Sequence, residues 1–247
     1  MTTMSAPGVV GDHSVGDHSV ELLLMLLADA RLPSGGHTQS GGLEPAFRAG
    51  MPVGDVPRYL AARLLTVVAS AAGAAVVVAR APHDPRWIAR VWREWEARTP
   101  SPALRQMEQR LGRGYLRLVE RLWGTAATEP LREAGRLLAT PDEAPATAPR
   151  PLAIGLVAGI AGLSPEQTAR LIGYDDVQTV VAACLKLEPL DPAGATGWVL
   201  AAFPQVEAMV RRVAPIREPR DIPAAGAPQI DQWAEAHTET KARLFSA

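Results

Sequence analysis

Five histidines and one cysteine are the side chains of this sequence best suited to hold a metal ion or to attack a substrate. The histidines are His13, His18, His37, His83 and His237. Imidazole suits nickel as it suits zinc and copper. His13 and His18 each follow an aspartate in a repeated Gly-Asp-His-Ser-Val segment. Two such flexible Asp-His pairs could bind a divalent ion weakly, or they could belong to a polar leader without function.

The arrangements that most enzymes use for catalysis are missing from the sequence. It has no P-loop, no Gly-x-Ser-x-Gly elbow, no His-Glu-x-x-His and no paired cysteines with zinc spacing. Cys184 lies in an apolar run, which is typical of an inert core thiol. Adjacent Asp175 and Asp176 point about 100° apart on a helix, so they do not converge on one proton and we expect them on a solvated face. The sequence therefore predicts a protein that is not an enzyme.

Composition limits the class of protein further. Hydrophobic residues make up 47% of the chain and aromatic residues only 5%, which favours packed helices over sheets. The net charge of -1 predicts no general attraction to nucleic acid or to an anionic membrane. The longest uncharged apolar run, residues 64–79, is shorter than the roughly 20 residues that a membrane span needs and predicts a core helix. A lone cysteine and the absence of signal-peptide features at residues 1–20 predict a cytoplasmic protein.

The pattern of apolar residues, caps and prolines predicts an all-α, single-domain helical bundle. Helices are expected at residues 21–30, 37–49, 56–80, 85–98, 104–123, 152–163, 164–187 (with a possible break at Gly173), 194–213 and 229–245. Ser164 and Gln167 have the spacing of a capping box, with proline at the first helical position. We divide the chain into a disordered leader (1–20), the helical domain (21–216), and a proline-rich linker with a partner-dependent C-terminal tail helix (217–247).

Two helices carry patterns that suggest contacts. The helix at 104–123 has an apolar face and, on another face, a basic stripe of Arg110, Arg113, Arg117 and Arg121. The stripe could meet an acidic partner, or it could be a solvated face with local partners such as Glu108 and Glu120. In the helix at 152–163, Gly155 and Gly159 allow another helix to approach closely, either within the chain or across a dimer.

Three segments carry a more specific signal. Residues 32–44 read Leu-Pro-Ser-Gly-Gly-His-Thr-Gln-Ser-Gly-Gly-Leu-Glu, and the chain ends with His237-Thr238-Glu239 followed by Arg243-Leu244-Phe245-Ser246. Between them, residues 182–190 contain Lys-Leu-Glu-Pro-Leu. These motifs, in this order, resemble those of the UreF family of urease accessory proteins. The chain departs from the family where His37-Thr38-Gln39 replaces an aromatic-containing stretch, and residues 99–151 match it least.

The resemblance implies a helical, cytoplasmic homodimer without catalytic activity, cofactor or metal site. It implies binding to the accessory protein UreD (also called UreH), recruitment of the nickel GTPase UreG and docking on apo-urease. The role would be urease maturation, in which the GTP state of UreG is coupled to nickel delivery through an internal passage. One alternative is a direct nickel metallochaperone using His13, His18, His37 and also His237, which predicts stoichiometric nickel on the isolated chain. Another is an unrecognised all-α enzyme using carboxylates such as Glu44 or Asp175.

Eleven residues are candidates for partner binding or for lining the passage. The first motif supplies His37, Thr38, Gln39, Ser40 and Glu44, although these residues could simply join two helices. Lys186 is a lone cation in an apolar helix, which suggests a partner contact or gating role, or a head group that reaches solvent. The tail supplies the apolar anchors Trp233, Leu244 and Phe245 and the polar residues His237 and Arg243. The tail could become ordered on UreD or dock on its own bundle.

Overall fold

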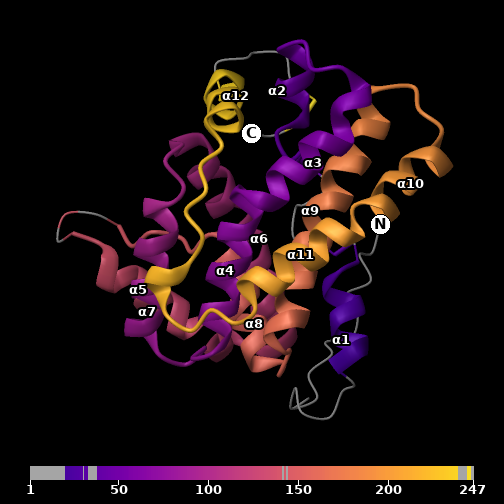
Figure 1. Ribbon diagram of the computed structural model, residues 1–247. Coiled ribbons are helices and arrows are strands. Elements are labelled where there is room, and N and C mark those ends of the chain that lie inside the picture. Colours follow the sequence, from indigo (N-terminus) through magenta and orange to yellow (C-terminus); the bar gives the residue numbers. More distant parts are fainter. Residues whose placement is uncertain are drawn as a thin grey trace, which may run out of the picture.

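The computed structural model describes residues 20–29, 31–32, 38–140, 142, 144–238 and 244–245, and the regular elements within them are all helical. The α-helices are α1 (Val20–Leu27), α2 (Leu43–Arg48), α3 (Val56–Leu65), α4 (Val67–Ala79), α5 (Pro85–Ala97), α6 (Pro102–Trp123), α7 (Glu129–Leu138), α8 (Arg150–Ile160), α9 (Pro165–Leu187), α10 (Pro192–Ala201), α11 (Phe203–Val213) and α12 (Pro228–Thr238). Short 3-10 turns cover Val53–Asp55, Thr125–Thr128 and Pro219–Asp221. The predicted all-α single domain is confirmed (Figure 1).

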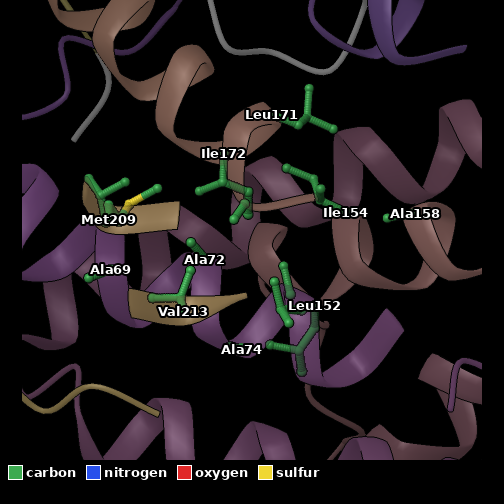
Figure 2. Packing of buried hydrophobic residues seen from close by; sticks show 14 of the residues in the cluster. Ala69, Ala72, Ala74, Leu152, Ile154, Ala158, Leu171, Ile172, Met209 and Val213 are labelled. Atoms are coloured by element: carbon green, nitrogen blue, oxygen red, sulfur yellow. The ribbon is translucent and has the colours of Figure 1, made fainter. Parts of the chain in front are cut away.

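Helix α4 is the centre of the bundle. It consists almost entirely of alanine and valine and is apolar on every side, which is typical of a buried helix. α5, α8, α9 and α11 all contact it. Figure 2 shows the resulting cluster, with Ala72 of α4, Leu152 of α8, Ile172 of α9 and Val213 of α11 among its members.

Two glycines of α8 allow α8 to lie directly on α4. A Cβ at Gly155 would approach Ala75 O to 2.5 Å, and one at Gly159 would approach Ala79 O to 2.7 Å. Because both neighbours belong to this chain, the close approach predicted for this pair is an intrachain contact.

Two predicted helices are each divided into two. The helix expected at 56–80 breaks at Thr66 (φ -118°, ψ -99°), which separates α3 from α4. The one expected at 194–213 breaks at Ala202, where Pro204 near the start of α11 cannot donate a backbone hydrogen bond. In contrast, α9 runs through Gly173 without a break, and Ser164 and Gln167 make both bonds of the predicted capping box. The helix expected at 37–49 is limited to α2, and the one expected at 229–245 ends with α12.

One helical stretch, Val53–Ala79, is long and apolar enough to cross a membrane by length and composition. Its most apolar window is 67% buried inside the protein, as expected of a core helix.

The proline-rich linker returns the chain across the bundle to the site described below. Arg98, directly after α5, donates hydrogen bonds to Ile222 O (2.7 Å) and Arg220 O (2.8 Å), and Ile222 and Pro223 are buried. α12 then packs against α6 and α2, far from the linker's first residues (Figure 1).

Candidate functional site

The first motif makes a tight turn into α2. Gly41 and Gly42 have φ values of +58° and +78°, a left-handed conformation that favours glycine. A Cβ on Gly42 would also lie 2.7 Å from the Tyr59 hydroxyl, which donates a hydrogen bond to Gly41 O (2.7 Å). The turn places Ser40 Oγ where it accepts a hydrogen bond from the backbone N–H of Glu44 (3.3 Å). The glycines and Ser40 therefore fix the position of Glu44.

The Glu44 carboxylate binds the C-terminal tail. Its Oε1 accepts a hydrogen bond from Leu244 N and its Oε2 accepts one from Phe245 N, both at 2.9 Å. Arg48 Nη2, one helical turn later, lies 2.8 Å from Oε1. The Glu44 side chain is only 3% exposed. We call this group of Glu44, Leu244, Phe245, His237 and Lys186 the tail clasp.

Hydrogen bonding makes the charged form of Glu44 favourable despite burial. Burial by itself raises the pKa of the Glu44 carboxyl group. The two backbone N–H groups of Leu244 and Phe245, with His237 and Arg48, outweigh that effect, so the pKa lies below its ordinary value of 4.5. Glu44 is therefore a carboxylate at neutral pH, and its charge holds the tail.

His237 and Lys186 enclose Phe245. His237 is buried, with Nε2 3.4 Å from Phe245 O and 3.7 Å from Glu44 Oε2. Lys186 Nζ of α9 lies over the Phe245 ring, 5.3 Å from its centroid. Phe245 is buried whereas the neighbouring Leu244 is 63% exposed. The clasp thus buries one apolar tail residue and leaves the next one open to solvent.

α12 is attached to the bundle at two further points. The Trp233 ring lies 6.1 Å from the Tyr59 ring of α3, centroid to centroid. On its other side, Glu235 accepts hydrogen bonds from Ser101 Oγ and from Ala103 N (3.0 Å) at the start of α6. The Ser101 hydroxyl and the Ala103 amide lower the pKa of Glu235.

A buried ion pair lies beneath the motif. Arg63 of α3 donates hydrogen bonds from Nε to Asp176 Oδ2 (3.0 Å) and from Nη2 to Asp176 Oδ1 (2.5 Å). Both side chains are less than 10% exposed, and the Arg63 guanidinium lies 5.7 Å from the Tyr59 ring centroid. The expectation of a solvated face is therefore wrong for Asp176. Asp175 points elsewhere and pairs with Arg150 of α8.

The comparisons with known proteins agree with this assembly of motifs. A family model named UreF matches residues 53–203. The urease accessory protein UreF of Mycobacterium sp. strain JLS is 32% identical over 226 residues, which are 91% of this chain and 97% of that protein. The UreF protein of Mycolicibacterium vanbaalenii is 31% identical over 91% of this chain. That of Mycobacterium tuberculosis strain H37Ra is 32% identical over 90% of this chain, and each match covers 97% of the relative. The chain belongs to the UreF family of urease accessory proteins.

Two of the candidate residues in this UreF-family chain line a cavity that is partly open to solvent. Gln39 and Lys186 border a space of about 110 Å³ together with Tyr115, Arg150 and Asp175. Gln39 Oε1 and the Tyr115 hydroxyl are both buried and have no hydrogen-bond partner among the described residues. The cavity therefore offers free polar atoms to water or to a small polar solute. Burial raises the pKa of Tyr115, so its hydroxyl stays protonated.

The fold brings together most of the residues that the sequence singled out. Glu44, Lys186, His237, Leu244 and Phe245 form the clasp, and Ser40, Gln39 and Trp233 border it. Thr38 is exposed and accepts a long hydrogen bond from Gln39 Nε2 (3.4 Å). His37 and Arg243 lie outside the described residues, as do His13 and His18.

Sequence reasoning missed Arg48, Tyr59, Arg63 and Glu235. Arg63 had no distinct signal in the sequence, because Arg58 lies in the same helix and is exposed. Burial raises the pKa of the Cys184 thiol to about 11, in agreement with an inert core thiol. Within the described part of the chain, no group of three or more His, Cys, Asp or Glu side chains could hold a metal ion.

Proposed function

We propose that this chain is a urease maturation factor that works as a non-enzymatic, cytoplasmic scaffold. In this role it binds UreD/UreH, recruits the nickel GTPase UreG and couples the GTP state of UreG to nickel delivery into apo-urease. Family membership supports the urease role in general. The observation that supports a scaffold most directly is the tail clasp, because it joins two motifs at opposite ends of the chain without assembling a nucleophile, a base and an oxyanion site.

The clasp has the features of a partner-binding surface. Leu244 is 63% exposed beside the buried Phe245, so an apolar side chain is presented at a fixed position. A fixed apolar anchor of this kind binds a partner with little loss of conformational entropy. We therefore assign UreD/UreH binding to this face, with Trp233 and His237 holding α12 in place.

Co-expression with the UreD-type protein of the same host tests the proposal. Size-exclusion chromatography with light scattering should give a complex of two copies of each protein that retains UreG. Leu244→Asp should abolish the complex, because it places a charge in the apolar contact. Leu137→Asp is the matched control, since Leu137 is an exposed leucine of α7 (43%) away from the clasp. Two separate peaks from folded wild-type proteins would contradict the proposal.

We assign the nickel passage within this chain to the cavity bordered by Gln39 and Lys186. Polar lining atoms without partners would suit a hydrated ion in transit. Ala183→Phe should fill the cavity, so that the complex with UreD/UreH still forms but urease activation falls. If activation is unchanged although the cavity is filled, nickel does not pass here.

We also propose that two copies pair through α1 and the start of α11. Leu22, Met25 and Leu26 of α1 are 65%, 68% and 44% exposed, and Phe203 is 43% exposed beside a groove of about 320 Å³ that Met25 also lines. A contiguous exposed apolar surface of this kind usually marks an interface. Met25→Glu with Phe203→Glu should convert a dimer into a monomer in light scattering. A wild-type chain that is monomeric at micromolar concentration would contradict pairing.

A further inference from the structure

A second surface lies away from the tail clasp, between α6 and α7. The extended segment 144–149 closes one side of a groove of about 370 Å³ between these helices. A Cβ at Gly112 of α6 would approach Ala148 O to 1.9 Å, and one at Gly135 of α7 would approach Ala146 O to 2.7 Å. The two glycines therefore allow the segment to lie against both helices, which gives the groove a defined shape.

Arginines line both sides of this groove but differ in their partners. On α7, Arg132 pairs with Glu120 (2.5 Å), and Arg136 pairs with Glu133 (2.7 Å) and with Glu129. On α6, Arg113 and Arg117 are exposed and have no ion pair among the described residues.

The carboxylates expected to neutralise the stripe on α6 bind elsewhere. Glu108 pairs with Arg150 of α8 (3.2 Å), and Glu120 pairs with Arg132. The arginines of the stripe are exposed, as expected of a solvated face, but these two carboxylates pair with arginines outside it. Arg113 and Arg117 present uncompensated positive charge at the edge of a groove.

We propose that this groove binds an extended acidic segment of a partner protein, with alternate carboxylates paired to Arg113 and Arg117. Residues four apart on a helix are separated by about 6 Å along the axis. Alternate residues of an extended peptide are separated by about 6.6 Å and point to the same side. The two spacings match, and each guanidinium can donate two parallel hydrogen bonds to one carboxylate.

The surroundings favour a peptide over a phosphate polyanion. Glu120 lines the groove itself, and Glu129 and Glu133 lie beside Arg136. A phosphate backbone, which is charged at every unit, would meet more repulsion there than a peptide whose carboxylates alternate with uncharged residues. Leu116 and Leu131 also line the groove and provide apolar surface that peptide side-chain stems can cover. The chain's net charge of -1 offers no general attraction to nucleic acid.

Fluorescence anisotropy with a labelled Glu-Ala-Glu-Ala-Glu peptide and the full chain tests this proposal. We expect saturable binding that weakens with added salt, and a dissociation constant at least about tenfold larger for R113E/R117E. The matched control is R58E/R211E, which reverses two exposed arginines on α3 and α11 and should leave binding unchanged. Circular dichroism should show that both variants fold.

Three results would overturn the proposal. The first is the absence of binding at millimolar peptide, and the second is equal affinity for Gln-Ala-Gln-Ala-Gln. The third is equal affinity of wild type and R113E/R117E. Displacement of the peptide by a single-stranded oligonucleotide at lower concentration than by free acidic peptide would instead assign the groove to phosphate. The experiment does not depend on urease partners, so it can fail while the scaffold function stands.

Discussion

The two sides of the first motif use charge in different ways. On the inner side, Arg63 and Asp176 form an ion pair between residues that lie 113 positions apart in the sequence. Both side chains are enclosed by α3, α9 and the Tyr59 ring. On the outer side, the Glu44 carboxylate binds backbone N–H groups of a tail whose Leu244 stays exposed. The inner pair can separate only if helices separate, whereas the outer bonds can break when a short segment lifts away.

This difference separates a structural interaction from an adjustable one. Removing one partner from a buried pair leaves an unpaired charge in the core, which is much more costly than losing hydrogen bonds at the edge. We therefore expect the inner pair to control the stability of the whole bundle and the clasp to control only the position of the tail.

The largest effect is expected for Asp176→Ala. The variant leaves the Arg63 guanidinium buried without its carboxylate, and the free energy of unfolding should fall by about 3–5 kcal/mol. Chemical denaturation followed by circular dichroism measures this change. The double variant R63M/D176L removes both charges and should lose less stability than Asp176→Ala. If the two lose equally, the cost is lost packing and not an unpaired charge.

Glu44→Gln should have a smaller and more local effect. The single side-chain oxygen of glutamine can accept a hydrogen bond from one of the two backbone N–H groups. Its amide nitrogen cannot accept a hydrogen bond from the other. Opening of the tail should become easier by about 1–3 kcal/mol, which is about fivefold to about 150-fold in hydrogen exchange of the Leu244 and Phe245 amides. Unfolding of the bundle should hardly change.

The control for this prediction is Glu207→Gln. Glu207 makes an exposed bidentate pair with Arg170 and has no contact with the tail, so tail exchange should match that of the wild type. A global loss of stability in Glu44→Gln as large as that of Asp176→Ala would abolish the distinction between the two sides.

Helices whose caps or apolar faces depend on neighbouring residues could be predicted from the sequence. The capping box at Ser164 depends on residues a few positions apart and is confirmed. On the predicted apolar face of α6, Leu111 and Tyr115 are buried, whereas Leu122 near the helix end is exposed. The break at Thr66 has no proline or glycine to signal it. The pairing of Arg63 with Asp176 depends on how α3 packs on α9, which no local pattern encodes. Family motifs identified Glu44 and the tail separately, but not that a carboxylate would hold backbone amides.

Acid should release the tail from the clasp. Because the pKa of Glu44 is lowered on folding, its contribution is fully present above the ordinary value of 4.5 and is lost as pH falls through the lower, folded value. Hydrogen exchange of the tail amides, recorded from about pH 7 to about pH 3, should report tail release before the helix signal in circular dichroism is lost. In Glu44→Gln the separate tail transition should be absent.

The smallest effect is expected for Lys186→Met. Methionine keeps the apolar stem and removes the charge over the Phe245 ring, an interaction worth about 0.5–1 kcal/mol at an exposed site. Tail opening in the isolated chain should therefore increase about two- to fivefold, and Lys186→Arg should restore it. If Lys186 also contacts UreD/UreH, Lys186→Met should weaken the complex by more than this factor. Equal factors in the isolated chain and in the complex would mean that Lys186 acts only by holding Phe245, so that the partner recognises the docked tail and not the cation.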